Sequence, residues 1–180
     1  MALCQLPGSQ RARPQLSFHA DPLEQAEHLA RREPKKPRQA SLRRAVSTAY
    51  YGLFHMLLTE GAAMLVPNNP AALRLQVRRA VNHQEMKQAC QRFASSAPAI
   101  AHLLHGSIEP QLIQVAAAFV QLQEERHKAD YDLFETFDRV AVLRRIAQVR
   151  DAFAAWKAVR HSLNAKVFLA ALFFQGRWRS

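Results

Sequence analysis

Glycine is scarce in this chain, and the local signals of β-structure are missing. Its 180 residues include 5 glycines. No Asn-Gly or Asp-Gly pair marks a tight hairpin, and there are no alternating runs of Val, Thr and Tyr. Alanine, leucine, glutamine and arginine are abundant instead, and these residues favour helices. The composition therefore predicts an all-α fold in one domain that is large enough to bury a core.

The sequence also has few features of a secreted, membrane-bound or metal-binding protein. Cys4 and Cys90 form no Cys-x-x-Cys pair, which fits free thiols in a reducing compartment. The apolar run at 167–174 is too short to cross a bilayer, and residues 1–20 lack the apolar core of a secretory signal. We therefore expect a cytoplasmic protein with no membrane partner. We also expect no metal and no cofactor, because no metal-ligand motif includes His83, His102, His105 or His161.

Acidic residues are scarcer than basic residues in this chain. The chain has 25 basic and 14 acidic residues, for a formal net charge of +11. A basic surface attracts RNA, DNA or acidic proteins through long-range electrostatics, and it can also serve solubility alone. Charge by itself leaves these alternatives open.

Capping residues and helix breakers predict about five to six helices. Residues 1–20 have no periodicity and are expected to form a disordered tail. The clearest helix is 41–61, with Ser41 as its cap and Gly61 as its stop. The other predicted helices are 21–32, 70–94 with a possible break near Asn82, 111–130, 139–160 capped by Asp138, and 164–175.

Two of these helices carry polar residues where a core helix does not need them. One face of helix 41–61 presents Arg44, Thr48, Tyr51 and His55, which are spaced 4, 3 and 4 residues apart. On helix 111–130, the apolar stripe through Leu112, Val115, Phe119 and Leu122 has an arginine, Arg126, at its next position.

A buried arginine is costly unless it is paired, and Asp130 lies one helical turn after Arg126. Two interpretations remain open. Arg126 either forms a structural ion pair at the helix end, or it points into a groove to hold a phosphate or stabilise developing charge. His127 lies about 100° around the helix from Arg126 and is either a surface or a catalytic residue. Tyr131 is expected to be a packed aromatic with a hydrogen-bonded hydroxyl.

Several segments together resemble the HEPN family. "LRRAVSTAYYGLFHML" (42–57) is similar to its signature helix, and "RHKADYD" (126–132) is similar to the late Arg-x-x-Ala-Asp-Tyr segment of one prokaryotic branch. "FAAWK" and "FLAALF" resemble its C-terminal helices. The resemblance covers about residues 21–175 and implies an up-and-down helical bundle that is often homodimeric. It also implies RNA or nucleotide as a target, in toxin–antitoxin or defence modules.

Many members of that family are metal-independent endoribonucleases that join two Arg-x4–6-His motifs across a dimer. By resemblance, Arg126 would stabilise the transition state in the composite cleft and Asp130 would orient it. The window for the histidine, 131–133, holds Tyr131, Asp132 and Leu133 instead. Tyrosine is a poor general base near neutral pH, because its ordinary pKa is about 10.

The resemblance therefore leaves catalysis open and extends the set of candidate residues. Tyr131, His127 and His55 are candidates for contact with the scissile group, and RNA or nucleotide would be bound by Arg44, Tyr51 and Lys128. Tyr131 is also a candidate acceptor of a nucleotide from a nucleotidyltransferase antitoxin. The alternative is a non-catalytic helical dimerisation or adaptor subunit that binds a partner protein, such as a larger effector.

Overall fold

The structure is a computed structural model that describes residues 20–68, 70–96 and 98–174, and within these residues it contains no strand. The all-α prediction is confirmed. The predicted tail lies outside the described residues except for Ala20, and so do Cys4 and position 175. The described helices are α1 (Ala20–Arg31), α2 (Gln39–Leu65), α3 (Ala71–Arg79), α4 (His83–Ala94), the 3₁₀-helix Pro98–Leu103, α5 (Pro110–Tyr131), α6 (Arg139–Val159) and α7 (Leu163–Phe174).

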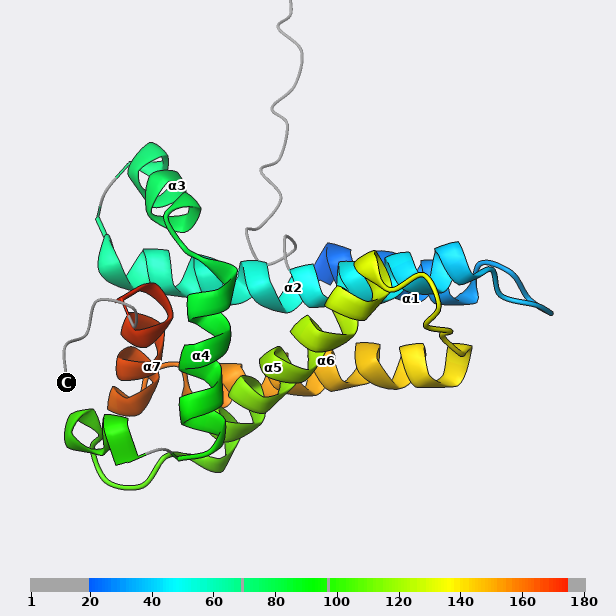
Figure 1. The fold of residues 1–180 in the computed structure, drawn as a ribbon. Helices are drawn as coiled ribbons and strands as arrows, with labels where there is room; N and C mark the ends of the chain where they lie inside the picture. Colours follow the sequence, from blue (N-terminus) through cyan, green and yellow to red (C-terminus); the bar gives the residue numbers. More distant parts are fainter. Residues whose placement is uncertain (1–19, 69, 97, 175–180) are drawn as a thin grey trace, which may run out of the picture.

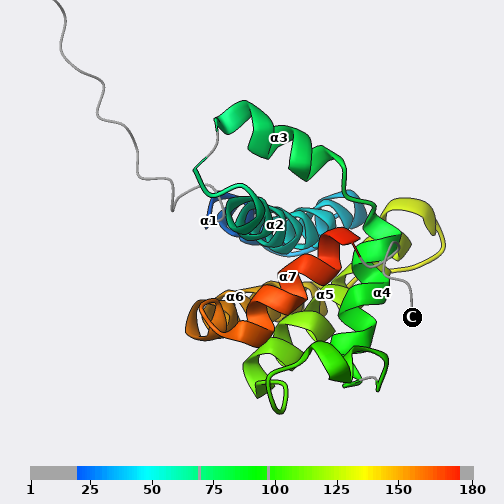
Figure 2. The same cartoon turned by 90° about the vertical axis from the view of Figure 1, so that its left-hand side faces the viewer.

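Helix α2 is the centre of the bundle (Figure 1). It contacts α1, α5, α6, α7 and α3, and most of its residues are buried. Helix α1 runs back along α2, α5 crosses it obliquely, and α4 and α7 close the end of the bundle that holds the C-terminal half of α2. Figure 2 shows α3 standing off from this body, and none of its nine residues is buried. No helix of the described part is long and apolar enough to cross a membrane.

Two helices begin with side-chain caps at positions that the sequence predicts. The Asn82 carboxamide oxygen accepts from the backbone N–H of Gln84 at 2.7 Å and starts α4. The predicted break in helix 70–94 is therefore real, and the described residues form seven α-helices rather than five or six. Asp138 starts α6 in the same way by accepting from the N–H of Val140 at 2.7 Å.

Both predicted ends of helix 41–61 are wrong. Arg38 is the N-cap residue of α2, and the Ser41 hydroxyl instead donates to Glu33 at 2.9 Å. Gly61 lies inside the helix, which continues to Leu65. It is needed there because a Cβ at this position would overlap the ring of Phe173 on α7. Tertiary packing, and not helix termination, therefore requires this glycine.

The C-terminal end of α5 is capped by an arginine from α2. Helix ends leave carbonyl groups without intrahelical donors, and a basic side chain can satisfy them. The Arg43 guanidinium also lies over the ring of Phe137, 5.5 Å from its centroid. It donates to the backbone carbonyls of Lys128 at 3.3 Å, Ala129 at 3.0 Å, Asp132 at 2.7 Å, and Glu135.

Further hydrogen bonds hold the connection between α5 and α6 against the start of α2. The Gln39 side chain donates to the carbonyl of Phe137 and accepts from its N–H, both at 2.8 Å. The Asp132 carboxylate accepts from the N–H of Phe134 at 3.0 Å and of Glu135 at 3.3 Å. The connection is therefore a defined structure that positions the end of α5.

Candidate functional site

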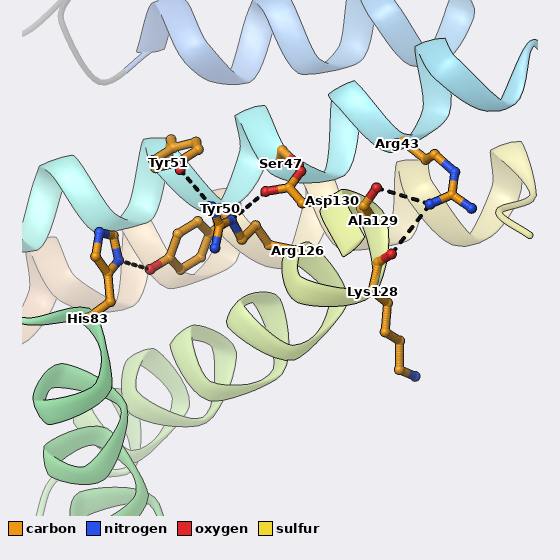
Figure 3. Close-up of polar contacts among 9 residues, drawn as sticks. All are labelled: Arg43, Ser47, Tyr50, Tyr51, His83, Arg126, Lys128, Ala129 and Asp130. Atoms are coloured by element: carbon orange, nitrogen blue, oxygen red, sulfur yellow. Dashed lines mark hydrogen bonds and ion pairs between the residues drawn. The ribbon is translucent and has the colours of Figure 1, made fainter. Parts of the chain in front are cut away.

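Arg126 lies at the centre of a polar network between α5 and α2 (Figure 3). Its side chain is 22% exposed, and its Nε is 2.6 Å from Oδ2 of Asp130. The ion pair predicted from the spacing is therefore present. The Nη2 atom donates to the hydroxyl of Tyr51 at 3.1 Å, and Asp130 accepts from the hydroxyl of Ser47 at 2.5 Å. Because Ser47 and Tyr51 both belong to α2, the network ties the two helices together.

The surroundings of Arg126 keep its guanidinium charged. Partial burial lowers its pKa, but Tyr51, Asp130 and Tyr131 more than offset this, so the pKa lies above its ordinary value. The guanidinium carbon also lies 5.7 Å from the ring centroid of Tyr51 and 5.5 Å from that of Tyr131. The guanidinium has five N–H donors, and its hydrogen bond to Tyr51 uses one of them on Nη2. Arg126 is thus a fixed cation that still has capacity for a ligand.

A histidine from α4 lies beside this network, and sequence reasoning missed it. His83 Nδ1 is 2.8 Å from the hydroxyl of buried Tyr50, and its ring stacks on Phe54 with centroids 4.2 Å apart. Burial lowers the pKa of His83, and the charge of Arg126 lowers it further. Burial raises the pKa of Tyr50, which keeps that hydroxyl protonated. No spacing signal could have found His83, because the start of α4 meets Tyr50 and Phe54 of α2 only in the folded chain.

Arg126 also lines an open depression between α4 and α5. The depression has a volume of about 420 Å³. It contains one carboxylate, that of Glu124, which lies 3.1 Å from Lys87 Nζ. Basic side chains outnumber acidic ones there, so it suits an anionic ligand. Its lining residues are Gln84, Lys87, Gln123, Glu124, Arg126, His127 and Lys128.

The polar face predicted on α2 lines a second hollow, which we call the α1/α2 groove. This groove has a volume of about 440 Å³, and most of its surface is apolar. The ring of His55 stacks on that of Tyr51, with centroids 6.0 Å apart. Tyr51 is thus shared, since its hydroxyl contacts Arg126 while its side chain lines the groove. The lining residues are Asp21, Pro22, Gln25, Arg44, Ser47, Thr48, Tyr51 and His55.

The candidate residues are therefore divided between two hollows. Arg126, His127 and Lys128 line the α4/α5 depression, whereas Arg44, Tyr51 and His55 line the α1/α2 groove. The prediction that Tyr131 is a packed aromatic is wrong, because it is 65% exposed at the end of α5. Its ring contacts that of exposed His127, at a centroid distance of 5.0 Å. Tyr131 is the last residue of α5, and the side of this turn that packs on α2 carries Ala129 and Asp130 instead.

The described residues hold no obvious metal or thiol chemistry. They contain no group of three or more His, Cys, Asp or Glu side chains that could hold a metal ion. Cys90 is fully buried in α4, and burial raises the pKa of its thiol well above the ordinary value. The polar network around Arg126 is therefore the best-supported candidate site.

Comparisons of the chain with models of protein families, with curated proteins and with solved structures found no match. The function must therefore be argued from the geometry of the site and from the sequence resemblance.

Proposed function

We propose that this chain is a HEPN-like protein that binds RNA or a nucleotide at the α4/α5 depression. In this proposal it acts as a homodimeric component of a toxin–antitoxin or defence module in the cytoplasm. The observation that carries the proposal is the position of Arg126. Asp130 and Tyr51 hold it at the wall of an open, predominantly basic depression, rather than sealing it in the core. A preorganised guanidinium beside a lysine is well suited to a phosphate group.

The active form of this proposal is a metal-independent endoribonuclease. The window 131–133 holds no histidine, so another group must transfer the proton. His83 is the best candidate in the fold, because its ring lies beside the Arg126 network, with Nδ1 2.8 Å from the hydroxyl of Tyr50 (Figure 3). A histidine that is neutral near pH 7 can accept a proton from a ribose hydroxyl. The non-catalytic form binds RNA or nucleotide through the same depression and leaves His83 as a packing residue.

RNA binding and cleavage by purified variants test the proposal. We expect Arg126→Ala to weaken binding of a labelled single-stranded RNA at least about tenfold, measured by fluorescence anisotropy. Arg144→Ala removes the same charge at an exposed position of α6, outside both hollows, and should have a small effect. Circular dichroism checks that each variant is folded. Equal losses in the two variants, or no binding of RNA or nucleotide by the wild type, would contradict the proposal.

Cleavage is measured in the same samples with EDTA present. If the ribonuclease form is correct, the wild type cleaves RNA, and Arg126→Ala and His83→Gln both abolish cleavage. RNA binding should survive in His83→Gln, because that substitution leaves the guanidinium in place. Binding without cleavage by the wild type would assign the non-catalytic form.

Tyr131 is a proposed acceptor of nucleotide transfer in this module. Its hydroxyl-bearing ring is exposed beside Arg126, so a transferase could reach it. Co-expression with a cognate nucleotidyltransferase should add one nucleotide mass to the wild type and none to Tyr131→Phe. An unmodified wild-type chain under those conditions would count against this role.

The second candidate function is a non-catalytic adaptor that binds a partner protein. It is favoured by α3, which buries none of its residues and exposes Leu73 and Leu75. In that case the Arg126–Asp130 pair only fixes the α2/α5 junction. Arg126→Ala would then lower the melting temperature while no RNA binding is detected in any variant.

A further inference from the structure

The most exposed large apolar side chains of the described part lie in the connection between α5 and α6. Phe134 is 96% exposed and Leu133 is 84% exposed. We call these two residues the knob. Tyr131, at the end of α5, is also exposed, at 65%. Exposed apolar surface commonly marks a site of association.

The knob is displayed on a rigid base. Arg43 caps the carbonyls on both sides of it, and the Asp132 carboxylate accepts from the backbone N–H of Phe134 itself. The pair of hydrogen bonds between Gln39 and Phe137 fixes the far end of the connection. A knob that is already ordered loses little conformational entropy when it docks.

The same chain carries a receptor of suitable shape and chemistry. The α1/α2 groove has a mostly apolar surface and a volume of about 440 Å³, which exceeds the volume of a phenylalanine side chain plus a leucine side chain. Pro22 and Tyr51 supply apolar surface, and half-buried Thr48 lies in its lining. The knob lies in the connection between α5 and α6 and the groove lies between α1 and α2, so the two surfaces share no residue.

We propose that two copies of this chain form a two-fold dimer in which the knob of each copy inserts into the α1/α2 groove of the other. A two-fold axis makes the contact reciprocal, so that one dimer holds two identical knob-and-groove contacts. This interface gives a structural form to the homodimer of the proposed function, and it does not depend on binding of RNA.

The charges around the two surfaces favour a second copy over an anionic partner. Exposed Asp132 adjoins the knob, and Arg44 lies in the lining of the groove. These opposite charges permit one ion pair per contact. An anionic membrane or an RNA strand would instead meet the exposed carboxylate of Asp132 beside the knob.

The area of the contact is adequate for a specific dimer. A phenylalanine side chain buries roughly 150–250 Å² when it is covered, and Leu133 adds to this. Two knobs, together with the groove surfaces that they cover, bury on the order of 1,000 Å². That is the lower range of specific protein–protein interfaces. We therefore expect a dimer that dissociates on dilution rather than an obligate one.

Sedimentation of the full chain over a concentration series tests the interface. We expect the wild type to be a dimer, and Phe134→Asp and Thr48→Glu each to shift it to monomer, because one places a charge on the knob and the other in the groove. Leu163→Asp is the matched control, since Leu163 is an exposed leucine outside the knob and the groove, and it should remain dimeric. Circular dichroism verifies that every variant is folded.

A mixing experiment separates this interface from any other. The Phe134→Asp chain keeps an intact groove, and the Thr48→Glu chain keeps an intact knob. Mixed together, they should form a heterodimer through the one remaining contact, although each is monomeric alone. Failure to form it, a wild-type monomer, or a Phe134→Asp dimer would overturn the proposal. Growth into an open series of larger species would overturn the two-fold closure.

The RNA assay on Phe134→Asp keeps the two proposals apart. A monomeric variant that still binds RNA supports the interface and leaves the RNA site intact. A dimeric wild type that binds no RNA retains the interface and contradicts the RNA-binding function alone. Binding of wild-type monomers to anionic lipid vesicles through Phe134 would overturn the proposed dimer.

Discussion

Replacement of Arg43 by alanine should destabilise the fold far more than replacement of its neighbour Arg44. The two arginines are adjacent in the sequence and lose the same charge, but only Arg43 caps the end of α5. Arg44 is exposed at the α1/α2 groove. The pair therefore separates the effect of the cap from the effect of net charge.

The magnitude follows from the carbonyl groups that Arg43 satisfies. The Nη1 atom lies 2.7 Å from the carbonyl oxygen of Asp132 and 3.0 Å from that of Ala129, and Nη2 donates to Glu135. Hydrogen bonds to a charged group contribute about 1.5–3 kcal/mol each, but bonds that share one half-exposed side chain do not add fully. We expect a loss of about 2–4 kcal/mol in the free energy of unfolding for Arg43→Ala. An ordinary surface substitution such as Arg44→Ala should cost less than about 0.5 kcal/mol.

Thermal and urea unfolding followed by circular dichroism measure the difference. For a chain of this size each kcal/mol lowers the melting temperature by about 2–4 °C, so Arg43→Ala should melt roughly 5–12 °C below the wild type. Arg43→Lys should rescue only part of the loss, because an ammonium group cannot reproduce the planar fork of a guanidinium. Equal melting temperatures for Arg43→Ala and Arg44→Ala would refute this account of the cap.

Two further predictions concern packing and pH. Gly61→Ala should lower the free energy of unfolding by about 1–3 kcal/mol, because its Cβ would overlap the ring of Phe173, and adding Phe173→Leu should recover part of the loss in urea titrations. If Phe173→Leu recovers none of the lost stability, the cause would lie in the backbone of α2 instead. Burial, reinforced by the charge of Arg126, lowers the pKa of His83 below its ordinary 6.5, so the unfolded chain binds a proton more readily. The stability that this contributes is complete above pH 6.5 and is lost as the pH falls toward the folded pKa. His83→Gln should reduce that slope in urea unfolding between about pH 7.5 and about pH 5, and an unchanged slope would show that His83 is not its source.

The sequence predicted the helices well where their ends depend on local side chains. Asn82 and Asp138 accept hydrogen bonds from N–H groups two residues ahead, so their capping roles are visible in the spacing alone. Ser41 and Gly61 are equally good local signals, yet both predictions are wrong. Ser41 bonds Glu33 across the α1–α2 loop, and Gly61 receives Phe173 from α7. In both cases a contact with a distant segment determines what the residue does.

In the candidate site too, the sequence predicted the contacts within one helix but not those that depend on packing between helices. Arg126 and Asp130 are four residues apart on one helix, so their pairing could be read from the sequence. The polar face of α2 could also be read, and four of its residues do line one groove. The exposure of Tyr131 could not be predicted, because the pattern does not show which side of the last turn of α5 packs on α2.

By itself, the sequence determined that the chain is helical, where α4 and α6 begin, and that an arginine with its own carboxylate partner ends the apolar stripe of α5. These properties depend on residues within about one helical turn of each other, whose geometry is fixed once a helix forms. Only the tertiary structure decided that Tyr51 bonds that arginine and Ser47 bonds its carboxylate partner, that His83 meets Tyr50, that Arg43 caps α5, and that Leu133 and Phe134 face solvent. Those facts depend on how α2, α4 and α5 cross, which is set by the packing of the whole core and not by any local spacing.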